Sequence, residues 1–444
     1  MPKTIVLLLL TLAGCASQAP LTQFTKDSGA PRAPEQAAVS FETADLALRV
    51  DPRRRTIEGD AALTFRALEP VSRLAVDLDR NLPIDAIAVD GAAVSGWSNP
   101  EGRITIPLAK PLAAGESATV RIRYGGKPHV AKRAPWDGGF VWAKTKGGHP
   151  WIATAVQGEG CDLFWPCIDH PMAEPKRVEL HITVPAPLVA AANGVQTGME
   201  EKDGWRTYHW RTRDPNTYAI ALNIAPYELL TAEYRSRFGN TYPLHFYYLK
   251  ENEAKARELF AEFPRMLDFY ESTIGPYPFA DEKMGVAETP HLGMEHQTIN
   301  AYGNGYAKGP DGFDWLLHHE FAHEWFGNQL TNRDWDDMWL HEGFGSYMGP
   351  LYSGYLLGDR GYFAGMARTR ARIRNKGALV SGESKTEEAV YRDDRGGPGG
   401  DIYDKGSYVL HALRNLIGDE AFFRAVRRLV YGTEDPRPGN FAPR

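Results

Sequence analysis

Apolar and polar residues alternate along the first half of the chain. Between Phe41 and Tyr227, short runs with a period of two are separated by glycine, proline, aspartate and asparagine. Successive side chains of a strand point to opposite faces, so this alternation is typical of strands with one buried face. We therefore expect a domain of antiparallel strands here, over residues 39–230. The clearest runs are Ile57 to Phe65, Leu74 to Leu78 and Val178 to Val184.

The pattern changes from about Thr231 onward. Apolar residues recur at helical spacing over residues 253–270, and the glycine- and proline-rich sequence 275–279 ends this predicted helix. A strand-like stretch follows at 283–288. We expect further helices ending near Gly327, over 335–344 and over 408–417. The sequence thus predicts a second domain, of helices and some strands, over residues 231–444.

The N-terminus has the features of a secretory signal. A cationic start and a short apolar core precede Leu12-Ala13-Gly14-Cys15. The apolar run is too short to span a bilayer. The last four residues match the bacterial lipobox, so we expect residues 1–15 to be a lipoprotein signal and Cys15 to carry the lipid. Ala16 favours the periplasmic face of the outer membrane, whereas a plain signal cut near Ala19 is the alternative.

Residues 16–38 are rich in alanine, serine, glutamine, proline and threonine and have little apolar surface to bury. Such a composition predicts a flexible tether. About 400 residues then remain, enough for two domains with their own cores. The net charge of −6 argues against nucleic acid as a partner. We interpret the basic run Arg368 to Lys376 as a solvated helix face.

Cys161 and Cys167 are the cysteines that remain once Cys15 is set aside. In an oxidising compartment they could form a small disulfide. Their spacing permits this bond without requiring it.

The clearest candidate for a catalytic site is the sequence His319-Glu320-Phe321-Ala322-His323. Histidines four residues apart on a helix lie on one face and can hold two corners of a tetrahedral zinc site. Glu320 is offset around the helix, where it can act as general base on a water molecule at the metal. Glu342, on the next predicted helix, would be the third ligand. An open fourth position is typical of a catalytic zinc site.

These motifs resemble those of the aminopeptidase N family, gluzincin zinc peptidases that include the leukotriene hydrolase. Eighteen residues separate the first motif from Glu342, with Trp-Phe-Gly-Asn at 325–328 and Trp-Leu-His-Glu-Gly-Phe at 339–344. The resemblance runs from about residue 40 to the C-terminus. It implies an N-terminal antiparallel β saddle domain, followed by a thermolysin-like α/β catalytic domain with one zinc ion per chain.

The resemblance also implies a substrate-binding group. Met294 and Glu295 match the family's G-x-M-E-N sequence, and Gly293 stands at its variable position. The glutamate of that sequence binds the free α-amine of the substrate, so we expect these three residues to contact substrate. Leu292 and His296 depart from that sequence at its first and last positions. A surface carboxylate without a ligand is the alternative for Glu295.

Two further residues are implied by their surroundings in the sequence. Gln157 precedes a stretch similar to the family's P-C-x-D-x-P and would face the N-terminal residue of the substrate, although a packed turn would also account for it. Tyr403 stands in Tyr-x-Lys-Gly, ahead of a predicted helix, and would donate its hydroxyl to the developing oxyanion.

The chain stops at Arg444, whereas family members usually continue, often with a helical C-terminal domain. We therefore expect a truncated or short form. The sequence predicts an exported, lipid-anchored zinc aminopeptidase that acts on peptides with a free N-terminus. One alternative is a zinc endopeptidase or another zinc hydrolase, favoured if the amine anchor is lost. Another is a catalytically silent peptide-binding lipoprotein, which would not need both Glu320 and Tyr403.

Overall fold

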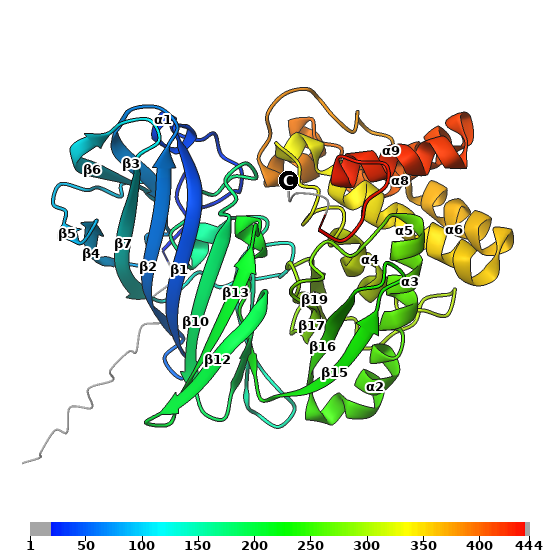
Figure 1. Cartoon of the computed structure of the whole chain (residues 1–444), viewed down its shortest axis with the longest axis horizontal. Coiled ribbons are helices and arrows are strands. Elements are labelled where there is room, and N and C mark those ends of the chain that lie inside the picture. The colour runs from blue at the N-terminus through cyan, green and yellow to red at the C-terminus, as the bar shows by residue number, and fades with distance from the viewer. Residues whose placement is uncertain (1–18, 440–444) are drawn as a thin grey trace, which may run out of the picture.

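The computed structural model describes residues 19–439, which form a unit of strands beside a unit of helices around a small sheet (Figure 1). This architecture agrees with the expected fold class. The predicted signal over residues 1–15, with Cys15, lies outside the described residues. No helix in the described part of the chain has the length and hydrophobicity needed to cross a bilayer.

The largest sheet of the first unit has eight strands in the order β12-β13-β10-β1-β2-β7-β4-β5. Every second residue of β2 is buried, as its alternation predicts. All pairs are antiparallel except β1 with β10, which run parallel. More than a hundred residues separate these two strands, and only a long connection allows parallel neighbours. The bounds are β1 Val39–Asp51, β2 Thr56–Ala67, β4 Ile84–Val89, β5 Ala92–Ala93, β7 Ser117–Gly126, β10 Arg177–Pro185, β12 Val195–Lys202 and β13 Trp205–Arg213.

Two smaller sheets complete the first unit. One has the order β11-β14-β9-β8, and the other pairs β3 with β6. Their bounds are β3 Val71–Asp77, β6 Arg103–Leu112, β8 Gly139–Lys144, β9 Pro150–Ala155, β11 Val189–Ala191 and β14 Asn223–Ala225. The loop after β9 carries Gln157 and turns toward the second unit.

The second unit contains a five-stranded sheet in the order β15-β16-β17-β19-β18, so that β18 lies at an edge. The first of these strands, β15, crosses the expected domain boundary at residues 230–231. The second unit therefore begins a few residues earlier than its composition indicated, because most of β15 is exposed and lacks a strong apolar pattern. The bounds are β15 Tyr227–Arg235, β16 Thr241–Leu249, β17 Met284–Glu288, β18 Gly293–Met294 and β19 Asn300–Tyr302.

The helices differ from their predicted ranges in two places. The single helix expected over 253–270 is two helices, α2 and α3, because the chain turns at residues 261–262 and Pro264 starts a new helix where its missing N–H costs little. The helix expected over 335–344 starts at Trp339, after a short 3₁₀ turn. The bounds are α1 Pro34–Ala37, α2 Glu253–Phe260, α3 Phe263–Thr273, α4 Trp315–His323, α5 Trp339–Leu357, α6 Asp359–Arg372, α7 Glu387–Tyr391, α8 Asp401–Ile417 and α9 Asp419–Tyr431.

The stretch predicted to be a flexible tether is packed against both units over its described part, residues 19–38. The amide of Ser28 donates to the carbonyl of Gly158 at 2.8 Å, and the carbonyl of Ser28 accepts from the amide of Glu387 at 3.0 Å. Further along, Gln36 Nε2 donates to Asp77 Oδ2 at 2.6 Å. The prediction was wrong here because it counted apolar surface, whereas polar contacts to buried groups hold this segment.

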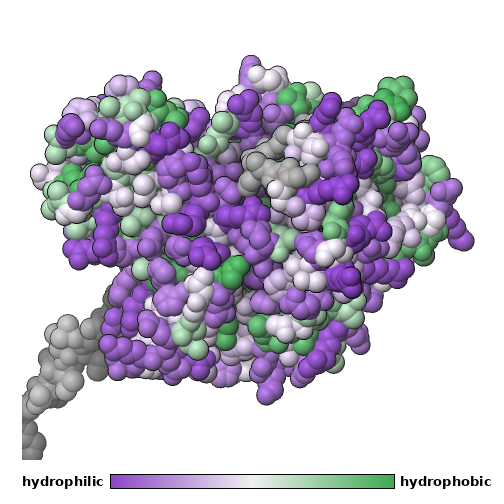
Figure 2. All heavy atoms as spheres, viewed as in Figure 1, coloured by the Kyte–Doolittle hydropathy of each residue, from purple (hydrophilic) through white to green (hydrophobic). Residues whose placement is uncertain are grey.

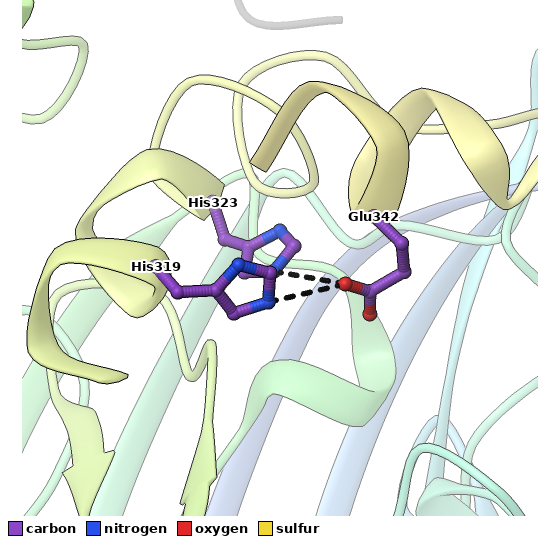
Figure 3. Close-up of side chains that lie close together, drawn as sticks. All are labelled: His319, His323 and Glu342. Carbon is purple, nitrogen blue, oxygen red and sulfur yellow. Dashed lines mark hydrogen bonds and ion pairs between the residues drawn. The ribbon is translucent and has the colours of Figure 1, made fainter. Parts of the chain in front are cut away.

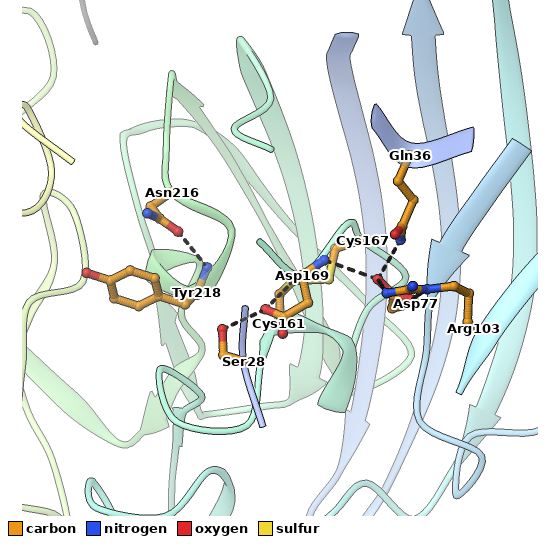
Figure 4. The surroundings of a disulfide bond; sticks show 9 residues. All are labelled: Ser28, Gln36, Asp77, Arg103, Cys161, Cys167, Asp169, Asn216 and Tyr218. Atoms are coloured by element: carbon orange, nitrogen blue, oxygen red, sulfur yellow. Dashed lines mark hydrogen bonds and ion pairs between the residues drawn. A yellow bond between two sulfur atoms is a disulfide. The ribbon is translucent and has the colours of Figure 1, made fainter. Parts of the chain in front are cut away.

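Cys161 and Cys167 form a disulfide, which decides the question that their spacing left open. Figure 4 shows it beside Asp77 and Asp169, which with Asp162 make up what we call the sealed carboxyl cluster. Arg103 Nε donates to Asp77 Oδ1 at 2.6 Å, and Ser28 Oγ donates to Asp169 Oδ1 at 3.1 Å. Both oxygens of Asp162 are buried without a hydrogen-bond partner among the described residues.

The two units share a continuous packed interface. The apolar core of the first unit includes Trp335, Met338 and Val390 from the second. The face shown in Figure 2 is mostly hydrophilic, with scattered apolar residues rather than one broad apolar patch. The contact between the units therefore buries the apolar surface that each presents to the other, and it brings loops of the first unit close to α4, α5 and α7.

Candidate metal centre

The two motif histidines converge with Glu342. Asp314 starts α4 by accepting the amides of Leu316 and Leu317, both at 3.1 Å. Four residues apart on this helix, His319 and His323 bring their Nε2 atoms to 3.1 Å from each other. Glu342 Oε2, from α5, lies 3.2 and 3.4 Å from the Nε2 atoms of His319 and His323 (Figure 3).

These three side chains fit a zinc ion. Two imidazole nitrogens and one carboxylate oxygen form a donor set of catalytic zinc sites, and bonds of about 2.0–2.2 Å at tetrahedral angles place ligand atoms about 3.4 Å apart. The three donor atoms also form a group close enough together to hold one ion. Apart from its contacts with the two imidazoles, the buried Glu342 Oε2 atom accepts no hydrogen bond from a described residue. A cation between the three groups would satisfy it.

The residues after the histidine motif support the site. The carbonyl of Phe326 lies 2.9 Å from His323 Nδ1, and this contact orients the ring so that Nε2 faces Glu342. Two residues later, Asn328 Nδ2 donates to the backbone carbonyl of Glu295 at 3.1 Å. The sequence Trp-Phe-Gly-Asn therefore connects the metal ligands to the neighbouring edge strand.

Glu320 lies between the ligands and that edge strand. A Cβ atom at Gly293 would lie only 2.4 Å from Glu320 Oε1, so a larger residue at 293 would displace the carboxylate. Burial raises the pKa of Glu320 well above its usual value, the charge of His323 opposes this, and Glu295 and Glu342 raise it further. The carboxyl group is thus suited to accept and hold a proton.

Glu295 is held by side chains from the first unit. Gln157 Nε2 donates to its Oε1 atom at 2.5 Å, and the Tyr218 hydroxyl donates to the same oxygen at 2.8 Å. Among the described residues, none donates a hydrogen bond to its second oxygen. Tyr218 was not anticipated, because no motif or periodicity marks it. Of the two departures from the family sequence, Leu292 lines the neighbouring cavity, whereas His296 is completely buried.

Tyr403 reaches the site from the first turn of α8, so the prediction that it precedes the helix was wrong. The first turns of α8 pack closely on α5 through two glycines: a Cβ atom at Gly343 of α5 would lie 3.1 Å from the Cα atom of Gly406 of α8. The hydroxyl of Tyr403 lies 2.9 Å from that of Tyr391, which the sequence did not indicate. Burial raises the pKa of Tyr403 well above its usual value, so its phenol stays a hydrogen-bond donor.

A cavity of about 400 Å³ brings these groups together. A second cavity, of about 470 Å³, shares Trp315, His319 and Tyr403 with it and is also lined by residues of α5 and α6. The site residues predicted from the sequence that line the first cavity are Gln157, Gly293, Met294, Glu295, His319, Glu320, His323, Glu342 and Tyr403. The structure thus gathers every predicted site residue that it describes.

Two family models match the chain. The model described as the peptidase M1 N-terminal domain matches residues 40–218, and the one described as the peptidase family M1 domain matches residues 311–433. Among curated proteins, the chain is 26% identical to leukotriene A-4 hydrolase of Xenopus laevis over 332 residues, which cover 71% of the chain. It is also 26% identical to human aminopeptidase B over 397 residues, which cover 83%.

The chain spans 51% and 58% of the lengths of these two relatives. It is similar over most of its length to solved structures of an M1 zinc metallopeptidase from Deinococcus radiodurans. One of these, a mutant bound to a Tyr-Ser-Ala substrate, has a TM-score of 0.75 and 27% identity, and the match covers 94% of this chain and 92% of that one. Another, with 28% identity and a TM-score of 0.74, has the same coverage.

Proposed function

Because the chain belongs to peptidase family M1, we propose that it is a zinc aminopeptidase that removes the N-terminal residue of peptides. The observation that carries this proposal is one cavity lined by both the His319, His323 and Glu342 site and Glu295. A carboxylate beside a metal site can pair with the ammonium group at one end of a peptide. A peptide bound in this way has its first peptide bond near the metal ligands.

The side chains have distinct roles in this mechanism. A zinc ion held by the two histidines and Glu342 would supply Lewis acidity, which polarises the scissile carbonyl and makes water more acidic. Glu320 accepts the proton of the attacking water and passes it to the leaving amine. Tyr403 donates its hydroxyl proton in a hydrogen bond to the oxyanion that develops on the carbonyl.

Glu295 determines that the cleaved peptide bond lies one residue from the N-terminus of the substrate. Gln157 and Tyr218 occupy one of its oxygens, which fixes the carboxylate and leaves the other oxygen for the α-ammonium group. A free amine is required because an acetylated amine carries no charge to pair with, and it leaves the buried carboxylate without a cationic partner.

The test uses purified protein with aminoacyl chromogenic amides and short peptides, each with a free or an N-acetylated amine. We expect rapid release of the N-terminal residue from the free substrates only, loss of activity with a chelator, and one zinc ion per chain by elemental analysis. Cleavage of acetylated peptides at internal bonds at a similar rate would replace this proposal with a zinc endopeptidase.

We further propose that the mature protein is anchored by a lipid on Cys15 to the periplasmic face of the outer membrane. The support is the lipobox at residues 12–15, and the Cys161–Cys167 disulfide suits an oxidising compartment. In a two-membrane bacterium, the full chain should partition with outer membranes, and Cys15→Ser should release or misprocess it. A wild-type protein that is wholly soluble in the periplasm would exclude the anchor.

A further inference from the structure

Residues 27–29 of the N-terminal segment lie between the two units. Asp27 and Ser28 are buried, with 6% and 1% of their surface exposed. This part of the chain precedes residue 40, where the match to the M1 N-terminal domain begins. Its contacts reach Glu295, the proposed amine anchor, by two routes.

The first route runs through the loop after β9. The amide of Ser28 donates to the carbonyl of Gly158 at 2.8 Å. The residue before it, Gln157, donates from Nε2 to Glu295 Oε1 at 2.5 Å. Ser28 is itself held in place, since its hydroxyl donates to Asp169 Oδ1 at 3.1 Å (Figure 4). The backbone of Ser28 therefore fixes the loop from which Gln157 reaches Glu295.

The second route runs through Trp335. A Cβ atom at Gly29 would lie 2.2 Å from Trp335 Cδ1, so the indole ring lies directly against the backbone of the N-terminal segment. The same indole packs on the ring of Tyr218, with the ring centroids 5.8 Å apart. The Tyr218 hydroxyl donates to Glu295 Oε1 at 2.8 Å. Because both rings are buried in close packing, the backbone at Gly29 supports the second donor to Glu295.

The same residues hold the start of α7, which also lines the cavity of about 400 Å³. The carbonyl of Ser28 accepts from the amide of Glu387 at 3.0 Å, and Asp27 Oδ1 accepts from the next amide at 2.9 Å. Both amides lie in the first turn of the helix, where no carbonyl of the helix itself can accept them. From the same helix, the Tyr391 hydroxyl contacts that of Tyr403 at 2.9 Å. Residues 27–29 thus join the loop beside the amine anchor to the helix beside the oxyanion donor.

We propose that residues 27–29 are positioning residues for amine recognition, which act on Glu295 through Gln157 and Tyr218. This inference rests on the proposed aminopeptidase function and adds a requirement to it. Both donors bind the same oxygen of Glu295, so the displacement of either one leaves the carboxylate less firmly oriented. A carboxylate that is already oriented pairs more strongly with an ammonium group than one that must first be ordered.

Gly29→Ala tests this role. The added Cβ atom does not fit beside Trp335, and the φ of +80° at Gly29 disfavours alanine, so either the segment or the indole ring must move. The measurement is kcat/KM for a leucyl chromogenic amide divided by that for its N-acetylated form, which we call the amine ratio. Gly29→Ala should lower the amine ratio by about tenfold or more, the scale of one lost hydrogen bond to a charged group.

Gln36→Ala is the matched control in the same segment. Gln36 is as buried as Ser28, but it donates to Asp77 of the sealed carboxyl cluster and not to the loop or to α7. Gln36→Ala should lower the urea midpoint of unfolding and change the amine ratio by about twofold at most. An equal fall of the amine ratio in Gln36→Ala and Gly29→Ala would overturn the inference, because it would show a general loosening of the protein.

A second pair of variants tests the segment with a smaller change. Asp27→Ala removes the acceptor for an amide of α7 and should lower the amine ratio by about threefold or more. Asp27→Asn should restore the ratio, because its amide oxygen can accept the same hydrogen bond. If Gly29→Ala does not fold, this pair decides the question, and an unchanged ratio in Asp27→Ala overturns the inference.

A combined variant tests the route. In a protein that already carries Gln157→Ala and Tyr218→Phe, both donors to Glu295 are absent. Gly29→Ala should then change the amine ratio by about twofold at most, since the residues through which it acts are gone. A further fall of about tenfold would show that residues 27–29 act by another route.

Binding separates this inference from the proposed function. By calorimetry, the wild-type protein should bind L-leucinamide more tightly than N-acetyl-L-leucinamide, and Glu295→Ala and Gly29→Ala should each reduce this difference. If neither turnover nor binding by the wild-type protein depends on the free amine, the proposed function fails and this inference fails with it. If Glu295→Ala reduces the dependence and a folded Gly29→Ala protein does not, only the inference about residues 27–29 is overturned.

Discussion

The protein buries two groups of carboxyl side chains that differ in their surroundings. Glu295, Glu320 and Glu342, which we call the open carboxyl group, border a cavity of about 400 Å³ together with two histidines. The sealed carboxyl cluster, Asp77, Asp162 and Asp169, lies beside the disulfide in the first unit and lines none of the cavities described above. Both groups are buried, but only the open carboxyl group borders a cavity and lies beside converging metal-ligand side chains.

Burial perturbs pKa values in both groups. It raises the pKa of Glu320 well above its usual value, and it raises the pKa of Asp169 to about 8. A perturbed pKa alone would therefore indicate the sealed carboxyl cluster as a functional site as readily as the open carboxyl group. The comparison leads to a separation of effects: substitutions in the open carboxyl group should affect catalysis, and substitutions in the sealed cluster should affect stability.

The largest effect is expected for Glu320→Gln. Removal of the general base should lower kcat by about 10²- to 10⁴-fold, because the attacking water then has no proton acceptor. Zinc content and the urea midpoint of unfolding should stay close to those of the wild-type protein, since Glu320 is not one of the three proposed ligands. Turnover near the wild-type rate would remove Glu320 from the mechanism.

Glu295→Ala should have the next largest effect. We expect kcat/KM for free-amine substrates to fall by about 30- to several-thousand-fold, the range for removing one partner of a buried charge pair. The matched acetylated substrates should lose little, because they carry no ammonium group. An equal loss on both kinds of substrate would show that Glu295 supports the site without binding the amine.

Tyr403→Phe should lower kcat by about 10²- to 10³-fold, as for the loss of one oxyanion donor. Substrate binding should change little, because the hydroxyl acts mainly in the transition state. Tyr391→Phe is a useful comparison, since its hydroxyl contacts Tyr403 at 2.9 Å but belongs to a residue outside the catalytic set. A rise in KM without a fall in kcat for Tyr403→Phe would contradict the assignment.

In the sealed cluster, Asp169→Asn should change the pH dependence of stability rather than catalysis. Burial raises the pKa of Asp169 from 3.8 to about 8, and the charge of Asp77 contributes. The folded state therefore keeps a proton that the unfolded chain loses. The stability that this proton gives the wild-type protein is present below about pH 4 and is lost as the pH rises to about 8.

Urea unfolding of both proteins at a series of pH values measures this effect. The unfolding free energy of the wild type minus that of Asp169→Asn should fall across this range, by at most about 1.4 kcal/mol per pH unit for one proton. A difference that does not depend on pH would show that Asp169 is ionised in the folded state. If Asp169→Asn lost as much activity as Glu320→Gln, the expected separation between catalytic and structural carboxyl groups would be wrong.

The sequence by itself determined the parts of the protein that depend on local geometry. Alternation in residues 57–65 predicted which side chains of this part of β2 are buried, because successive side chains of a strand point to opposite faces. Spacing on α4 predicted that His319 and His323 share a face, and the family resemblance added Glu342 from the next helix. These residues lie within a short stretch of chain, so little long-range packing is needed to bring them together.

Only the tertiary structure decided the contacts between distant segments. Gln157 and Glu295 are 138 residues apart, and they meet because the first unit packs its loop against the edge strand of the second. The N-terminal segment, which composition predicted to be flexible, is ordered by polar groups on both units. Tyr218 and Tyr391 carry no local signal, because their surroundings arise from packing between distant segments. Periodicity describes only the direction of a side chain within its own helix or strand.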